Sequence, residues 1–272
     1  MSTLRKKRQY KIGLLIGVVL SIISVFFLYV FNYFLLFDAF INYEGAFEIL
    51  LVISIRILLL SIITIYLFTK WFKQEAQYLS DIPFLLGLFF LILIFGKVVD
   101  LFWDLTFFTF NTNLVLFIVK IRYFIIIFEV APLIYLGFEV IFFRLEDKYT
   151  KLKDKRFMNL FRAKLIVLIV GIESTAITFI PNMTILGMVL PIILIPSLAG
   201  IVYIFFLAYR LKRLRVIKPK ILTIGFLLYM ISNIFRPVMQ NILGETATYI
   251  IVVEFVDVCI FIVIFLGLYK KT

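Results

Sequence analysis

Histidine is absent from this chain of 272 residues, and cysteine occurs only once. Without histidine there is no His-ligated zinc site, no Ser-His or Cys-His nucleophile pair and no imidazole proton relay. The single cysteine, Cys259, lies in an apolar run and has no partner for an intramolecular disulfide. No motif indicates a cofactor, a metal or a catalytic group, so the sequence favours a non-enzymatic protein.

Residues that interrupt helices are also scarce, with 7 Pro and 12 Gly. Hydrophobic residues make up 64% of the chain, and the mean hydropathy is +1.14. Typical globular domains contain about 45–50% apolar residues, and a soluble fold of this size lacks the interior to bury more. The predicted fold class is therefore all-α: a polytopic transmembrane helical bundle that forms one integral membrane domain over residues 1–272.

Eight apolar runs are long enough for a transmembrane helix, which needs about 20 residues. They are residues 12–37, 49–69, 83–102, 114–143, 165–182, 185–209, 221–241 and 248–269. Basic residues precede the first run, but its apolar core is too long for a signal peptide and no small-residue cleavage site follows. We therefore interpret it as a retained span. The overlong fourth run predicts a strong tilt or an interfacial start.

The distribution of positive charge predicts the topology. The net charge is +12, and 23 of the 28 Lys and Arg residues lie before the first run, in the connectors 70–82, 144–164 and 210–220, or after the last run. The other connectors contain no Lys or Arg, which predicts eight spans with both termini cytoplasmic. The predicted partner of these cations is an anionic lipid head group at the plasma membrane, and not a nucleic acid.

The basic segment 144–164 is the only long polar stretch. It is predicted to be a cytoplasmic loop that tethers two spans, or alternatively an amphipathic helix at the interface, because apolar positions are mixed with its charges.

Ionisable residues within the spans are the informative ones, because each costs at least ~2.5–3.5 kcal/mol near the bilayer centre. Such a residue needs a partner, a water-filled cavity or a route to the interface. The candidate ligand- or ion-binding residues are Arg56, Lys97, Asp100, Arg122, Glu129, Glu173, Asn233, Arg236, Glu254 and Asp257.

Local spacing suggests partners for some of these residues. Lys97 and Asp100 lie three residues apart on one helix face and are expected to pair. A short loop joins the third and fourth spans, so Arg122 and Glu129 are expected to join them in a mixed network.

Three further charges, all in the second half of the chain, suggest a similar layout. Arg236 is expected to face Glu254 or Asp257, and Pro237 is expected to bend its helix and make room for water or a ligand.

Arg56 and Glu173 are the most centrally placed charges, and neither has an obvious partner in its own span. A buried pair between them is one expectation. If Glu173 is unpaired, it becomes a candidate for binding a proton.

A short internal similarity relates the two halves of the chain. Residues 134–137 read IYLG and residues 264–267 read IFLG, near the ends of the fourth and eighth runs. The match indicates either a parallel four-plus-four duplication or a chance similarity in a chain rich in Ile, Leu and Phe.

Three functions are consistent with these features. The favoured one is a ligand-sensing, receptor-like membrane module with a polar cluster in the outer half of the bundle. The alternative is a small secondary transporter or channel that uses membrane-embedded carboxylates to bind a small molecule or an ion. A membrane enzyme acting on lipid is the least favoured, because no catalytic cluster is visible near an interface.

Overall fold

The computed structural model describes residues 2–75, 77–106, 112–146, 149, 154–211, 217–244 and 246–269. All regular elements of these residues are helices, which confirms the predicted all-α class for this part of the chain. They are α1 (Ser2–Phe31), α2 (Tyr33–Asn42), α3 (Ala46–Phe72), α4 (Ile82–Thr106), α5 (Thr112–Leu145), α6 (Lys155–Phe179), α7 (Met183–Arg210), α8 (Pro219–Leu243) and α9 (Ala247–Leu268).

Six of these helices contain segments that are long and apolar enough to cross a membrane. The segments are Gln9–Phe31, Ala46–Phe72, Ile82–Thr106, Val115–Phe142, Pro219–Gln240 and Ala247–Leu268. They correspond to the first four and the last two predicted spans. Large apolar side chains on their outward faces are exposed, among them Leu58, Ile65, Phe128, Phe235 and Phe255. Exposed apolar belts of this kind are characteristic of an integral membrane protein.

The predicted fifth and sixth spans correspond to α6 and α7. Within the described residues, α7 contributes a shorter apolar helix, Ile195–Arg210. Helix α6 begins in the basic segment, and its apolar stretch is interrupted by Arg162, Lys164 and Glu173.

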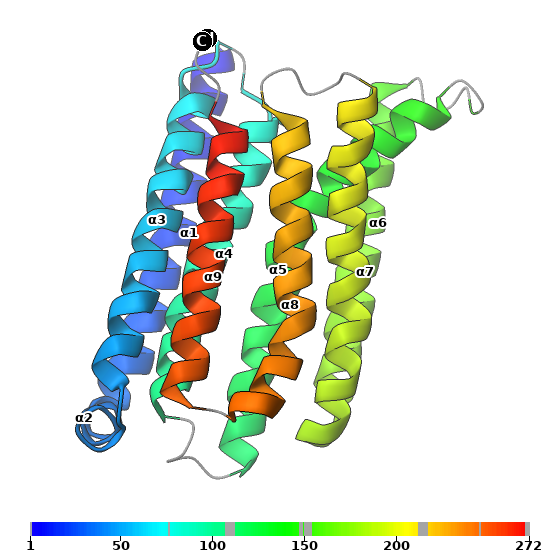
Figure 1. The fold of residues 1–272 in the computed structure, drawn as a ribbon. Coiled ribbons are helices and arrows are strands. Elements are labelled where there is room, and N and C mark those ends of the chain that lie inside the picture. The colour runs from blue at the N-terminus through cyan, green and yellow to red at the C-terminus, as the bar shows by residue number, and fades with distance from the viewer. Residues whose placement is uncertain are drawn as a thin grey trace.

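The first predicted span, residues 12–37, is wrong at its end. The helix stops at Phe31, and Asn32 has a non-helical backbone conformation while its side chain donates a hydrogen bond to the carbonyl of Leu28 at 2.7 Å. A separate helix, α2, follows and lies across the end of the bundle (Figure 1). It buries Ala39 and exposes Phe34.

The predicted loop 144–164 is shorter than expected. Helix α5 extends to Leu145 and α6 begins at Lys155. Phe142 stacks on Phe161, with ring centroids 5.5 Å apart, and this contact holds the second turn of α6 against α5. Residues 147, 148 and 150–153 of this segment lie outside the described residues.

All helices except α2 run along the bundle with alternating direction, and α1 begins at the same end as that at which α9 ends (Figure 1). The segments that hold 23 of the 28 Lys and Arg residues consequently all join the bundle at this end. We call it the basic end, and the other the acidic end.

Six helices close a ring. Helix α3 packs against α4 and α9, α4 against α5, α5 against α7, α7 against α8, and α8 against α9. Helices α1 and α6 lie outside this ring, α1 against α4 and α6 against α5. The Tyr29 hydroxyl fastens α1 by donating to the carbonyl of Val98 at 2.7 Å.

The packing order within the ring occurs twice, as α3, α4, α5 and then as α7, α8, α9. A four-plus-four duplication would produce this order. The outer helices do not follow it, because α1 packs on the middle helix of its triplet whereas α6 packs on α5, in the other half of the chain.

An apolar core fills the ring at its basic end. Phe226 of α8 stacks on Phe205 of α7 with centroids 5.1 Å apart, and Phe89 of α4 meets Phe226 edge-on at 6.0 Å. Buried aliphatic side chains surround these rings, including Leu67, Leu86, Leu136, Leu222 and Ile264. We call this layer the apolar floor, because it closes one end of the space that the ring encloses.

Candidate functional site

A cavity of about 350 Å³ lies within the ring, between the apolar floor and the acidic end. All six ring helices contribute to its lining. Its lining includes Trp103 and Asp104 from the last turn of α4, Gln240 from the end of α8 and Tyr249 from the first turn of α9. These residues lie in the helix turns nearest the acidic end, which places the mouth of the cavity there.

Helix α4 presents a charged face to the cavity. The ammonium of Lys97 lies 2.7 Å from Asp100 Oδ2 and 2.9 Å from Glu254 Oε1. The predicted pairing of Lys97 with Asp100 is therefore confirmed, and Lys97 also links α4 to α9.

Arg122 of α5 holds Asp100 from the other side. Its Nε donates to one carboxylate oxygen of Asp100, and its Nη2 donates to the other at 3.2 Å. Its Nη1 lies 3.8 Å from Glu129 Oε2. The predicted network of these charges with Lys97 is confirmed, and the two-pronged contact fixes the guanidinium plane.

Gly96 makes room for this guanidinium. A Cβ atom at position 96 would lie 2.8 Å from Arg122 Nη1, so a larger residue there would require the guanidinium to shift away from the backbone of α4. Gly96 was not among the residues predicted from the sequence. A glycine next to Lys97 in the middle of an apolar helical run is the signal that points to it.

Arg56 of α3 is fully buried and holds two carboxylates of α9. Its Nη1 lies 2.6 Å from Glu254 Oε2 and 2.8 Å from Asp257 Oδ2. The Phe261 ring lies against the same guanidinium, with its centroid 5.1 Å from Cζ.

The predicted pair between Arg56 and Glu173 is wrong. Glu173 lies on α6, which packs on the outside of the ring, and it is partly exposed and does not line the cavity. Hydropathy alone does not tell which of the apolar helices the ring leaves out.

Arg236 of α8 completes the set of cations. It donates to Asp257 and lies 3.8 Å from Glu254, as the sequence predicted. The hydroxyl of Ser232 donates to the second oxygen of Asp257 at 2.8 Å. Asn233 lines the cavity, and its amide donates to the carbonyl of Tyr229 at 2.8 Å.

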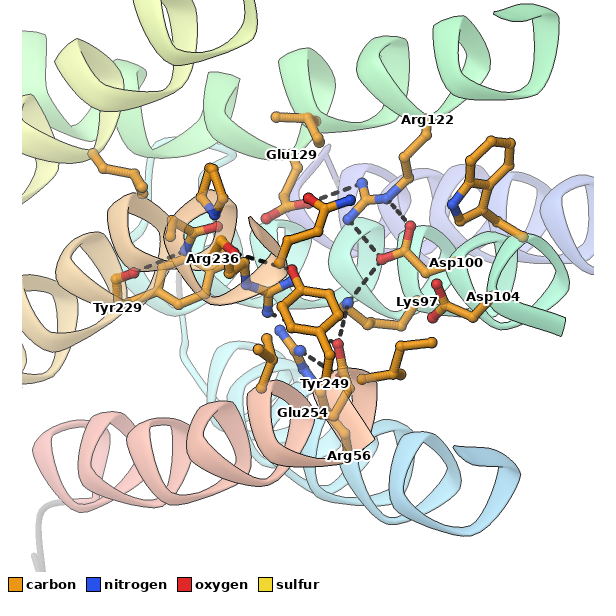
Figure 2. Close-up of a pocket in the computed structure, with 18 of the residues that line it drawn as sticks. Arg56, Lys97, Asp100, Asp104, Arg122, Glu129, Tyr229, Arg236, Tyr249 and Glu254 are labelled. Atoms are coloured by element: carbon orange, nitrogen blue, oxygen red, sulfur yellow. Dashed lines mark hydrogen bonds and ion pairs between the residues drawn. The ribbon is translucent and has the colours of Figure 1, made fainter. Parts of the chain in front are cut away.

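These contacts form one continuous network across five ring helices (Figure 2). In spatial order its members are Glu129, Arg122, Asp100, Lys97, Glu254, Arg56, Asp257 and Arg236. Nine of the ten predicted site residues, all but Glu173, belong to this network or line the cavity. The candidates did not include the aromatic lining residues, which are Tyr43, Phe89, Trp103, Tyr229 and Tyr249.

Two carboxylates near the cavity are less well satisfied than the others. Asp104 forms no ion pair or hydrogen bond with the residues that the structure describes. The Oε2 atom of Glu129 is buried and accepts no hydrogen bond. Among the described residues no three acidic or cysteine side chains are grouped as metal ligands would be.

Comparison with protein-family models, with curated proteins and with solved structures finds no match to this chain.

Proposed function

We propose that this protein is a receptor-like membrane module that binds a small polar molecule in the ring cavity. The observation that carries the proposal is the combination of a charged cavity at one end of the ring with the apolar floor at the other. A pocket that is closed below suits reversible binding from one side of a membrane. A concave pocket in which polar groups converge is also a usual form of small-molecule site.

The charged network gives such a module a way to respond to its ligand. The network joins α3, α4, α5, α8 and α9. A ligand that contacts one residue of the network would therefore change the strength of the ion pairs between these five helices. A ligand shifts a conformational equilibrium by its difference in affinity for the two states. Binding at the acidic end would in this way alter helix packing at the basic end.

We also propose that the basic end is cytoplasmic, that the chain crosses the plasma membrane eight times, and that the cavity opens to the outside. The positive-inside rule supports this orientation, because the acidic-end connectors contain no Lys or Arg. The alternation of helix direction in Figure 1 supports an even number of crossings. Anionic lipids would then pair with the basic connectors.

Thiol labelling tests this orientation. In a Cys259→Ser background, Gln240→Cys at the cavity mouth should react with a membrane-impermeant thiol reagent in intact cells. Lys220→Cys at the basic end should react only after the membrane is permeabilised, and it serves as the matched control on the same helix. Labelling of Lys220→Cys in intact cells would reverse the proposed orientation.

A solute screen tests the proposed function. Purified protein in detergent is heated with small cationic, neutral and anionic solutes, and binding is detected as a rise in the unfolding midpoint. We expect at least one solute to stabilise the wild type. Asn233→Leu removes an amide from the cavity wall and should weaken this effect, whereas Thr223→Val, on the same helix but near the floor, should not.

A second candidate function is a secondary transporter caught with its floor closed. Proline residues inside α5 and α8, Pro132 and Pro237, favour it, because interrupted helices often rearrange during transport. Proteoliposomes separate the two candidates: the stabilising solute is offered in radiolabelled form, and binding without uptake supports the receptor-like module. Uptake that Asn233→Leu abolishes would replace it with the transporter.

A further inference from the structure

We infer that the cavity selects an organic monocation, an ammonium group on an aromatic or aliphatic body, with the ammonium held at Glu129. This inference rests on the proposed function and names the class of ligand. It follows from the unequal way in which the buried charges are paired.

The cations of the network are already engaged. Lys97 contacts two carboxylates, and so does Arg56. Arg122 is held by Asp100, and Arg236 by Asp257. Each positive group thus has a carboxylate at hydrogen-bonding distance within the described residues.

Glu129 has no equivalent contact. It is only 4% exposed and lines the cavity, its buried Oε2 accepts no hydrogen bond, and its nearest cation is Arg122 Nη1 at 3.8 Å. Figure 2 shows the carboxylate extending from α5 toward the centre of the site. A buried carboxylate without a hydrogen-bond donor is costly, and a ligand that supplies N–H donors would remove this cost.

The charge balance points to the same ligand. Four cations, namely Arg56, Lys97, Arg122 and Arg236, face five carboxylates, namely Asp100, Asp104, Glu129, Glu254 and Asp257. With all of them ionised, these described residues carry one net negative charge. A bound monocation brings the cluster to neutrality, whereas a bound anion would double its net charge.

Several guanidinium atoms also lack a hydrogen-bond acceptor: Arg56 Nε and Nη2, Arg122 Nη1 and Arg236 Nε. They offer contacts to an anion, but each belongs to a side chain whose charge a carboxylate already balances. Among the carboxylates of the charged network, Glu129 is the one whose charge is least compensated, and for this reason we favour the cation.

The walls of the cavity suit an ammonium attached to a larger body. Phe89, Trp103, Tyr229 and Tyr249 line the cavity, and the faces of such rings attract cations. The volume of about 350 Å³ is that of a small-molecule pocket and far exceeds the space that a single ion occupies.

Three compounds of similar size and shape but different charge test the inference. Wild-type protein in detergent is titrated with 2-phenylethylammonium chloride, with neutral 3-phenylpropanamide and with sodium 3-phenylpropanoate. We expect the ammonium to raise the unfolding midpoint in a saturable way, and the two other compounds to have no effect at the same concentrations. Glu129→Gln should lower the affinity for 2-phenylethylammonium by about ten- to a hundredfold, because a hydrogen bond to a charged group is lost.

Glu173→Gln is the matched control, since it removes a carboxylate of the same type outside the ring, and it should leave the ammonium affinity unchanged. If Glu129→Gln does not fold, Asp104→Asn at the mouth is tested in its place, and it should lower the affinity for the ammonium compound several-fold. The comparison of the three compounds on the wild-type protein does not depend on either variant. Stabilisation by the propanoate in place of the ammonium would overturn the inference and leave the proposed function standing. An ammonium effect that persists in both carboxylate variants would also overturn it. If no solute of any charge binds, both the inference and the proposed function are contradicted.

Discussion

Replacing Arg56 with methionine is expected to lower the free energy of unfolding by about 3–5 kcal/mol. Methionine keeps most of the side-chain volume but removes a fully buried cation that contacts Glu254 at 2.6 Å and Asp257 at 2.8 Å. Both carboxylates then lose a partner in the middle of the ring, and the net negative charge of the cluster doubles. The measurement is the midpoint of thermal unfolding in detergent, followed by size-exclusion chromatography of the heated protein.

A double variant separates the charge effect from lost packing. Arg56→Met combined with Glu254→Gln restores the wild-type net charge of the cluster, while Asp257 keeps Arg236 and the hydroxyl of Ser232. Removing both partners of a buried pair is usually far less costly than removing one. The double variant should therefore be more stable than Arg56→Met alone. If the double variant is less stable than Arg56→Met, the unbalanced charge is not what destabilises the single variant.

Phe226→Ala is expected to have a comparable effect, of about 3–5 kcal/mol, through the apolar floor. Phe226 is fully buried, stacks on Phe205 and meets Phe89 edge-on, so alanine leaves a void where three helices converge. Phe235→Ala on the same helix is the matched control, because that ring is 56% exposed on the outer face. Thermal unfolding of the two variants side by side is the measurement, and equal midpoints would contradict the structure of the floor.

The helices follow from the sequence because a bilayer leaves few alternatives. Every backbone polar group in hydrocarbon must be paired within its own segment, so a long apolar run becomes a helix. Hydropathy does not show where each of these helices begins and ends. At the break, Asn32 leaves the helical conformation and its side chain donates to the carbonyl of Leu28. Apolar residues continue on both sides of Asn32, so nothing in the hydropathy pattern separates α1 from α2.

The site was predicted where its contacts are local and missed where they are not. Lys97 and Asp100 share one helix, and Arg122 lies on the next, so spacing and a short connection bring them together. Arg56 and Glu254 are 198 residues apart, and their contact depends on α9 packing beside α3. The chain contains several carboxylates of similar depth, and the order of helices around the ring decides which one Arg56 meets.

The closure of the ring between α3 and α9 has a consequence for biosynthesis. Translation produces α3 and α4 long before α9, yet Arg56 and Lys97 depend on Glu254, which lies 198 and 157 residues downstream. Until the ribosome has made the last helix, both cations lack this counter-ion, and a helix that exposes such a charge to lipid is poorly retained. A chain that stops before α9 therefore lacks the carboxylate that Arg56 and Lys97 contact in the full bundle. Only a chain that includes α9 gives Arg56 and Lys97 the carboxylate of Glu254.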